Sequence, residues 1–202
     1  MSCAVLDNKE HECTFDLDRV RDIFKASLVG AEDVDLDQYL EGFKELIKFC
    51  DLMGSMFSFV SSEISEKIKR RFATLFTMTD FETTQNLLAK KDYTSGSRTL
   101  LRLHRGLDFI RTFLEKLGKL NPDDSTSSIG REAYTKTLAS YHSFFIRQGA
   151  YIAMYTLPTQ KVLLQRVTAT ALAGLPAMLQ VTNIVYDRVQ AHYKAKDLLE
   201  LP

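Results

Sequence analysis

The stretch "SRTLLRLHRGLDFIRTFLEKL", residues 97–117, has the apolar rhythm that decides the fold class. Its large aliphatic residues recur at steps of three and four, at Leu100, Leu103, Leu107, Ile110, Leu114 and Leu117. This spacing places one apolar stripe along an α-helix. Ser95 or Ser97 is a suitable N-cap, and Gly118 is a suitable stop. We therefore predict an amphipathic helix over residues 97–117.

The same helical period dominates the rest of the chain. Residues 36–72 follow it, with a possible bend at Gly54, and a further helical run covers about 129–157 before Pro158. "NPDDSTSS" (121–128) is the clearest loop, and "GLP" (174–176) is expected to divide the remainder into two helices. Strand signals are nearly absent. The sequence predicts one all-α domain over 1–202, with seven or eight helices and residues 1–15 as a flexible extension.

Composition bounds the classes of function. The 202 residues are 45% hydrophobic and 26% charged, as in ordinary globular proteins, and Lys+Arg and Asp+Glu tie at 26 each. A chain without net charge has no global field that favours nucleic acid, so any electrostatic function must be local. The three cysteines show no metal or disulfide spacing. No basic-then-apolar leader and no apolar run of about 20 residues is evident, so we expect a soluble intracellular protein.

Three arginines stand on one face of the predicted helix over 97–117. At about 100° per residue, Arg98, Arg102 and Arg105 fall within a stripe of about 60° opposite the leucines. The ordinary interpretation is a solvated helix face. However, the stripe has no acidic partner at i±4 before Asp108. The first-turn N–H groups also favour an anion, and paired guanidinium groups suit phosphate. From this segment alone the solvated face stays the first interpretation, and these two details support a local phosphate site as the alternative.

Two further stretches carry candidate polar residues. In "FSFVSSEISEKIKRR" (57–71), Glu63 and Lys67 are four apart, which is also the pattern of a plain surface ion pair. In "YHSFFIRQGAYIAMYTLPT" (141–159), His142 precedes Phe144 and Phe145, and a structural histidine is the simpler interpretation. The four histidines lack metal-ligand spacing, and no nucleophile elbow, Gly-rich phosphate loop or HExxH motif is present. We therefore predict no catalytic residues, no metal and no cofactor.

Together, "FSFVSSEISEKI", "SGSRTLLRLHRGLDFI", "YHSFFIRQGAYIAMYTLPT" and the terminal "DLLELP" resemble the glycolipid transfer protein superfamily. The resemblance is closer to the branch that transfers ceramide-1-phosphate, and it runs from about residue 36 to the C-terminus. "RTLLRLHRGLDF" is its most specific motif. The resemblance implies a two-layer helical sandwich of about eight helices. Such a fold encloses a hydrophobic lipid pocket with a headgroup site at the surface.

The resemblance also assigns the residues that hold the sphingoid base. The headgroup carboxylate corresponds to Glu63 and the lysine one turn later to Lys67, and the histidine near the sphingoid amide corresponds to His142. The family carboxylate is normally aspartate. The additional methylene of Glu63 displaces the charge by about 1.5 Å, a distance to which hydrogen-bond geometry is sensitive.

The phosphate contacts are carried over in the same way. Arg98 and Arg102 correspond to the paired arginines that hold the phosphate, and Lys91 to a further basic contact, with Lys90 as the alternative. In the sugar-binding branch a tryptophan that stacks on the hexose occupies the position of Arg102. This chain has no tryptophan, so the resemblance favours phosphate over sugar.

The expected function is non-vesicular transfer of ceramide-1-phosphate or a related sphingolipid between membranes. Phe144 and Phe145 are candidate membrane contacts, with core packing as the alternative. We expect a non-enzymatic monomer in the cytosol that visits Golgi, endosomal or plasma membranes and does not bind nucleic acid. Three alternatives stay open: glycolipid transfer or sensing in the same fold, a lipid-free helical interaction module, and a lipid-phosphate hydrolase.

Overall fold

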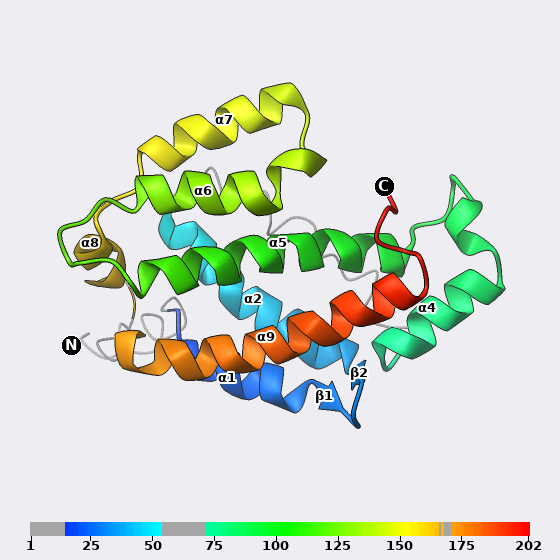
Figure 1. The fold of residues 1–202 in the computed structure, drawn as a ribbon. Helices are drawn as coiled ribbons and strands as arrows, with labels where there is room; N and C mark the ends of the chain where they lie inside the picture. The colour runs from blue at the N-terminus through cyan, green and yellow to red at the C-terminus, as the bar shows by residue number, and fades with distance from the viewer. Residues whose placement is uncertain (1–14, 54–71, 166, 168–170) are drawn as a thin grey trace, which may run out of the picture.

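The regular secondary structure of the described residues is mainly helical (Figure 1). The computed structural model describes residues 15–53, 72–165, 167 and 171–202. This part contains eight α-helices: α1 (Leu17–Ala26), α2 (Leu36–Met53), α4 (Leu75–Thr84), α5 (Gly96–Leu117), α6 (Ser127–Thr137), α7 (Phe144–Tyr155), α8 (Gln160–Gln165) and α9 (Ala171–Ala195). Two short 3-10 helices are η2 (Leu87–Ala89) and η3 (Ala139–Tyr141), and β1 (Leu28–Val29) pairs antiparallel with β2 (Asp33–Val34). The all-α prediction is confirmed for these residues.

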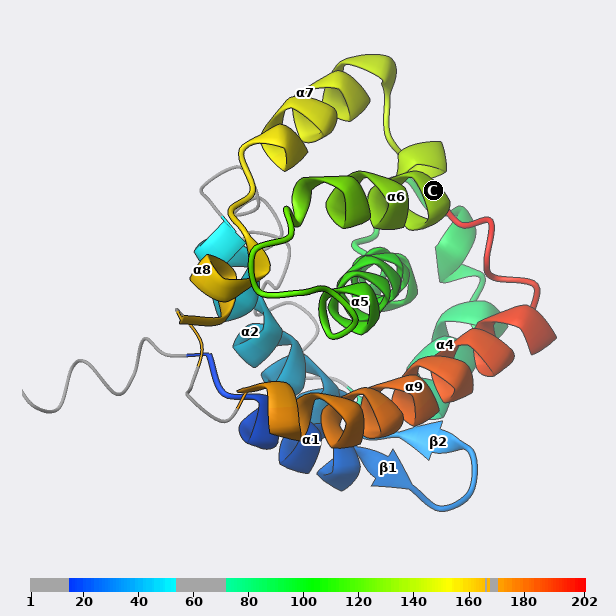
Figure 2. The ribbon, with the colours of Figure 1, turned by 60° about the vertical axis from the view of Figure 1, so that its left-hand side comes forward.

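Helix α5 lies at the centre of the molecule. α6 and then α7 lie on one side of it and α1 and α9 on the other (Figure 2), while α2 crosses behind it in the view of Figure 1. The side chain of Ser95 caps α5 by accepting a hydrogen bond from Arg98 N, and Gly118 follows the last turn. The whole aliphatic stripe predicted from the sequence is at most 3% exposed. The predicted helix is therefore correct to within one residue at its start.

The layer below α5 depends on aromatic packing. α1 packs against both α2 and α9. Phe24 of α1 lies 6.0 Å from the ring of Tyr39 on α2, which in turn lies 6.2 Å from Phe43. Gly42 permits this contact, because a Cβ there would lie 2.5 Å from the Phe24 ring. Burial of each such ring contributes roughly 1.5–3 kcal/mol, so this interface is a principal part of the core.

The start of α1 is tied to α2 by a buried carboxylate. Glu45 is 3% exposed and accepts a hydrogen bond from Asp16 N at 3.1 Å. It also pairs with Lys48 at 2.8 Å and with Arg19 at 3.5 Å. A buried charge is tolerated when it is paired and hydrogen-bonded in this way. The contact fixes where the described chain enters the fold.

The helical run predicted over 129–157 is wrong as a single element. The chain forms α6, η3 and α7, and His142 and Ser143 between them are extended. α6 also starts at Ser127, inside the predicted loop over 121–128. A continuous helix of that length would measure about 43 Å, and its second half could not pack against its first half. The break folds α7 back beside α6 (Figure 1), and no glycine or proline in 138–143 marks it.

The second boundary error concerns Pro176. The "GLP" stretch was expected to separate two helices, but α9 runs through it from Ala171 to Ala195. α8 ends at Gln165, so two helices are present with their boundary in a different place. Pro176 lies in the second turn of α9, where its missing N–H removes one hydrogen bond to the carbonyl four residues earlier. That cost is small beside the burial of a 25-residue helix.

None of the described helices has the length and apolar character that crossing a membrane requires.

Candidate functional site

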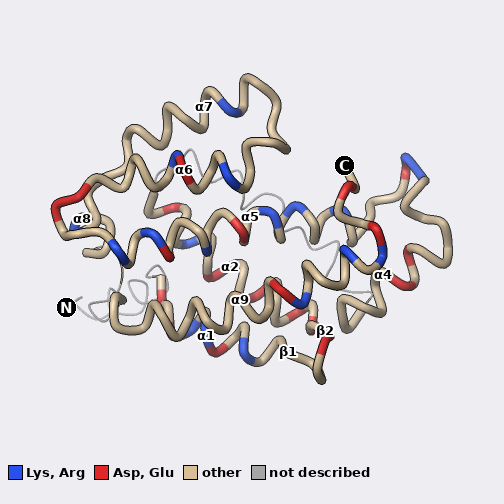
Figure 3. The backbone as a smooth tube through the Cα atoms, in the orientation of Figure 1, with Lys and Arg blue, Asp and Glu red and all other residues tan. Residues whose placement is uncertain are grey.

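The arginines of α5 occupy different environments, although the sequence places them on one stripe. Arg98 is half-buried, and its guanidinium group donates to the backbone carbonyl of Leu88 in η2. The Nε of Arg98 is buried without a hydrogen-bond partner among the described residues. Arg102 follows one turn later and is exposed. Arg102 therefore presents a cationic group at the surface, whereas Arg98 is held partly below it; Figure 3 shows basic residues on successive turns near the start of α5.

Arg105 does not share this role. Its Nη2 donates to the carbonyl oxygens of Leu199 at 2.7 Å and Leu201 at 3.2 Å. Its guanidinium carbon lies 3.9 Å from the centre of the Tyr141 ring. Arg105 thus fastens the C-terminal segment to α5 and η3. The arginine cluster predicted from the sequence separates into a candidate phosphate pair, Arg98 and Arg102, and one structural residue.

The expected contribution of the α5 N-terminus to anion binding is wrong. Gly96 N and Ser97 N donate to the buried side chain of Glu82 on α4, at 2.7 Å and 3.0 Å. Arg98 N donates to the Ser95 hydroxyl at 3.1 Å. Helix N-termini attract anions through these N–H groups, and here the protein supplies its own anion. A bound phosphate must therefore be held by side chains.

His142 lies outside a helix, in the turn between η3 and α7. Its Nδ1 is 2.7 Å from the hydroxyl of Tyr134 on α6. Burial lowers the pKa of His142, so the neutral imidazole is favoured at pH 7. Because the preceding residue, Tyr141, stacks on Arg105, the segment that carries His142 lies beside the turn of α5 that follows Arg102.

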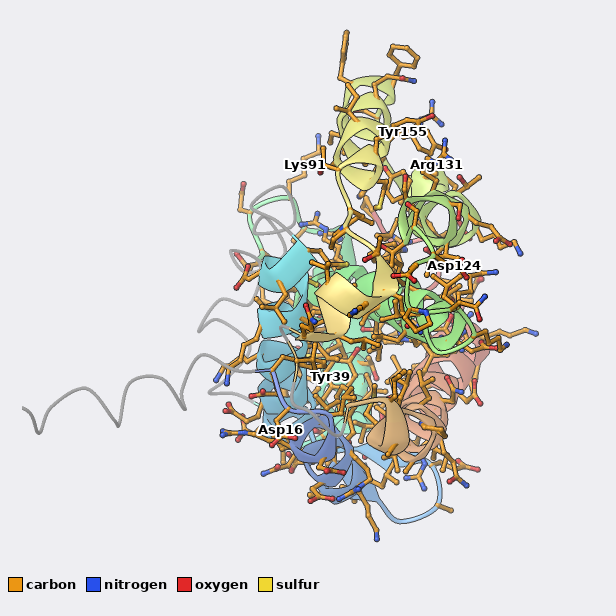
Figure 4. The ribbon with its side chains drawn as sticks, turned by 90° about the vertical axis from the view of Figure 1, so that its left-hand side faces the viewer. Asp16, Tyr39, Lys91, Asp124, Arg131 and Tyr155 are labelled. Atoms are coloured by element: carbon orange, nitrogen blue, oxygen red, sulfur yellow. The ribbon has the colours of Figure 1, made fainter. Side chains whose placement is uncertain are left out.

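The remaining predicted headgroup residues are less defined. Lys91 lies in the turn after η2, and its side chain is exposed and extends from the loop (Figure 4). Lys90 beside it is exposed as well. Glu63 and Lys67 lie outside the described residues, so their predicted roles stay predictions. The structure therefore places Arg98 and Arg102 on the first half of α5, with η3 beside it. The position of the predicted carboxylate, Glu63, is not among the described residues.

The polar pocket beside this site is not the predicted hydrocarbon cavity. It has a volume of about 280 Å³ and lies between α5, η3, α9 and the C-terminal segment. Charged groups of both signs line it, among them Arg105, Asp108, Lys136 and Glu200. Such a lining is unsuited to alkyl chains, which require apolar walls. The enclosed lipid pocket stays a prediction.

Several large apolar side chains of α7 are uncovered, whereas Tyr151 packs partly against the core. Phe145 is 84% exposed, Ile152 67% and Phe144 59%. Tyr155 near the end of α7 is 65% exposed, and Arg131 of α6 lies over its ring at 4.3 Å, as the labelled pair in Figure 4 shows. An exposed apolar patch of this kind marks an interaction surface. The alternative, that Phe144 and Phe145 pack in the core, is wrong.

Sequence reasoning missed two groups that shape this site. Glu82 lies in a segment with a weak helical pattern of apolar residues. It is fourteen residues from Gly96, and no sequence motif links the two positions. The carbonyl of Leu88 is a backbone group, which carries no residue-type signal. Both act through the path of the chain between α4 and α5. A serine cap at Ser95 was the one local signal, and it indicated the helix start without its buried partner.

Comparisons with known proteins agree with this architecture. The family model described as "Glycolipid transfer protein (GLTP)" matches residues 34–169. The chain is 36% identical over 208 residues to the ceramide-1-phosphate transfer protein of Xenopus laevis, covering 93% of this chain and 97% of the relative.

Solved structures show the same fold. The crystal structure of the mouse ceramide-1-phosphate transfer protein in its apo form superposes with a TM-score of 0.86 at 34% identity, covering 93% of this chain and 100% of that one. The human ceramide-1-phosphate transfer protein in complex with 12:0 ceramide-1-phosphate gives a TM-score of 0.83 at 32% identity, with the same coverage. With the central arginine helix and the layered helices described above, these matches show that the chain belongs to the glycolipid transfer protein family.

Proposed function

We propose that this protein transfers ceramide-1-phosphate between membranes without chemically altering it. The observation that carries the proposal is the pair Arg98 and Arg102, one turn apart near the start of α5, in a chain without tryptophan. The relatives named as ceramide-1-phosphate transfer proteins, which match nearly the whole chain, support the same substrate. Sugar recognition by aromatic stacking would need a platform that this chain lacks at position 102.

The phosphate contacts follow from the chemistry of guanidinium. A phosphomonoester carries a charge of about −1.5 to −2 at pH 7, and a guanidinium group donates to it through two parallel N–H groups. The buried, unpartnered Nε of Arg98 is a donor without an acceptor among the described residues. Arg102 is exposed at the next turn, and Lys91 adds a cation from the preceding loop. We infer that these three residues clamp the phosphate.

We assign selection of the sphingoid base to Glu63 and His142. A carboxylate at the mouth of the pocket accepts hydrogen bonds from both the amide N–H and the 3-hydroxyl of a sphingoid base. A glycerophospholipid has neither donor, so binding it leaves that carboxylate unpaired at a cost of about 1–3 kcal/mol. Lys67, four residues after Glu63 in the sequence, offsets the repulsion between the carboxylate and the phosphate. His142, held by Tyr134, supplies a neutral imidazole to the amide region.

The alkyl chains supply affinity with little selectivity. About fourteen methylenes at ~0.8 kcal/mol each are worth more than 10 kcal/mol relative to water, but the bilayer offers nearly the same environment. Extraction from the bilayer is therefore close to balanced, which suits a shuttle. In this proposal an apolar pocket encloses the chains while the headgroup contacts decide which lipid leaves the membrane.

We propose that α7 provides the membrane contact. Phe144 and Phe145 lie at its start, separated from His142 by Ser143, so that docking would bring the headgroup site to the bilayer surface. The only charged residue within α7 is Arg147. In a chain with no net charge, contact through a few aromatic side chains is transient. We further propose a monomer that resides in the cytosol and visits Golgi, endosomal or plasma membranes.

The test is a vesicle assay with three labelled lipids side by side: ceramide-1-phosphate, a glycosphingolipid and phosphatidic acid. The wild-type protein should move ceramide-1-phosphate fastest and return it chemically unchanged. Arg102→Leu should reduce that rate by more than about ten-fold, because it removes charge-assisted hydrogen bonds worth about 1.5–3 kcal/mol. Lys119→Leu, which removes a charge 69% exposed beyond the other end of α5, is the matched control and should transfer normally.

Other outcomes identify the alternatives. Fast transfer of the glycosphingolipid by both wild type and Arg102→Leu would indicate a glycolipid carrier. Release of free phosphate would indicate a hydrolase. Native mass spectrometry that finds no co-purified sphingolipid, together with no transfer of any lipid, would indicate a lipid-free interaction module.

A further inference from the structure

Glu82 of α4 is a completely buried carboxylate surrounded by donors. Its Oε1 accepts from Gly96 N at 2.7 Å and from the Tyr93 hydroxyl at 3.0 Å. Its Oε2 accepts from the Ser95 hydroxyl at 2.7 Å and from Ser97 N at 3.0 Å. All four donors belong to the loop before α5 or to the first turn of α5. The side chain has 0% exposure, so this contact is made inside the protein and not at a surface.

A close approach of α4 to α5 makes these hydrogen bonds possible. A Cβ at Gly96 would lie 2.5 Å from the sulfur of Met78 and 3.5 Å from Oε1 of Glu82. Only a residue without a side chain lets the first turn of α5 come this near. Gly96 is therefore the residue that allows the carboxylate to reach the backbone N–H groups.

The same network holds both ends of Arg98. Its backbone N donates to the Ser95 hydroxyl oxygen at 3.1 Å, and that hydroxyl donates to Glu82. Its guanidinium group donates to the carbonyl of Leu88, in the short segment that leads from α4 to α5. Lys91 lies in this segment as well. The candidate phosphate ligands at the start of α5 thus depend on one connection, and Glu82 is the charged group at its centre.

A carboxylate suits the contact between α4 and the start of α5, because it accepts hydrogen bonds from N–H groups that lie at a positive helix end. The start of a helix carries a partial positive charge, and here two of its N–H groups are directed at Glu82 instead of the surface. A buried carboxylate is costly unless its acceptor positions are filled, and four donors fill them. Because Glu82 occupies the N–H groups of Gly96 and Ser97, the candidate phosphate ligands near the start of α5 are side chains.

We propose that Glu82 is a positioning residue of the phosphate clamp, acting through Arg98. The inference rests on the proposed function, since it concerns how Arg98 meets the phosphate. Glu82 does not touch the lipid. It fixes the first turn of α5 and the loop that carries the Leu88 carbonyl, so that the guanidinium of Arg98 is held ready before the ligand arrives, and pre-organisation of this kind raises affinity.

The experiment is a double-mutant cycle with Glu82→Gln, Arg98→Ala and the double variant. Binding of fluorescent ceramide-1-phosphate from neutral phosphatidylcholine vesicles and the thermal midpoint are measured for each. Glu45→Gln is the matched control, because it makes the same chemical change at a second buried carboxylate that ties α1 to α2. Tyr93→Phe is a milder second variant, since it removes one of the four donors to Glu82 and leaves the carboxylate in place.

Positioning predicts a specific pattern. Glu82→Gln should weaken binding about ten-fold in the wild-type background, by a hydrogen-bond effect, and less than about two-fold when Arg98 is already alanine. Tyr93→Phe should weaken it about two- to three-fold. Glu45→Gln should lower the thermal midpoint without changing affinity.

Two results would overturn the inference, and they are distinguishable. Equal losses from Glu82→Gln in both backgrounds, or unchanged binding in folded Glu82→Gln and Tyr93→Phe, would show that Glu82 is only a stabilising residue. Unchanged binding in Arg98→Ala would show instead that the phosphate clamp itself is wrong, and with it the proposed function of Arg98.

Discussion

Helices α5 and α7 differ in how much of their apolar surface is buried, although both are rich in large apolar residues. α5 buries eleven of its residues, and its leucine stripe is covered by α6, α9 and α2. α7 buries only Ala153 and Met154, and it leaves Phe145 84% exposed and Ile152 67% exposed. Protein covers the apolar face of α5, whereas within the described part of the chain one apolar face of α7 has no cover.

The comparison shows that an apolar helix face indicates that something covers it, but the sequence of the helix does not tell what does. For α5 the partner is the rest of the chain, and its polar stripe is left to hold a ligand. For α7 we propose that the partner is a bilayer, which would cover Phe144 and Phe145 only during docking. A protein that extracts a lipid needs both kinds of helix, one to give the site a rigid frame and one to bring it to the membrane.

The largest expected effect is on the covered helix. Leu107→Ala removes a side chain of α5 that is 0% exposed, so lost burial and the remaining cavity should cost about 2–5 kcal/mol of unfolding free energy. Chemical denaturation measures this value. Ile152→Ala on α7 is the matched control and should stay within about 0.5 kcal/mol of wild type. A similar loss in both variants would mean that α7 is covered after all.

The next largest effect is the pH dependence of stability that arises from His104, a buried residue of α5. Burial, together with the charges of Arg111 and Arg105, lowers the pKa of His104 to about 4, although a hydrogen bond to Gln190 opposes the shift. The unfolded chain then binds the proton more readily, with a pKa near 6.5. Stability is therefore fully present above about pH 6.5 and is lost as the pH falls toward 4, by up to about 3 kcal/mol from this group.

His104→Gln isolates this contribution, because carboxyl groups titrate equally in both proteins. The loss of thermal stability between pH 7 and pH 4 should be smaller in the variant than in wild type. Parallel curves would indicate that His104 takes up its proton in the folded protein without cost, contrary to its burial at 1% exposure.

The smallest expected effect is on the uncovered helix. Phe145→Ser should leave the unfolding free energy unchanged within about 0.5 kcal/mol, but it should slow transfer of ceramide-1-phosphate between vesicles about five-fold, because burial of a phenylalanine in lipid contributes about 1.5–3 kcal/mol. Ile184→Ser removes an exposed aliphatic residue from α9 (41% exposed) and should transfer at the wild-type rate. Equal rates for both variants would remove α7 from the docking surface.

Several features could be predicted from local patterns. The leucine spacing predicts α5 and its buried side, and Ser95 and Gly118 mark its ends. The arginine stripe identifies Arg98 and Arg102 as candidates, but the same spacing also groups them with Arg105, which holds the C-terminal segment. A helical stripe gives the direction in which a side chain leaves the axis. It does not give what meets the side chain there.

The break between α6 and α7 and the role of Glu82 could not be predicted from periodicity. Residues 138–143 carry no glycine or proline, so the turn that places His142 against Tyr134 follows from the packing of α7 on α6. Glu82 and Gly96 are brought together by the approach of α4 to α5. In both cases the deciding contact joins two different elements, so the periodicity within one helix does not reveal the contact.

The sequence by itself determined the helical class, the central helix with its two faces, and the absence of the tryptophan that sugar stacking would need. Only the tertiary structure decided which arginine serves the fold, which carboxylate takes the N–H groups at the start of α5, and which apolar face stays uncovered. The physical reason is that helical periodicity arises from hydrogen bonds between residues four apart. Burial and charge pairing depend on distances in space between residues far apart along the chain.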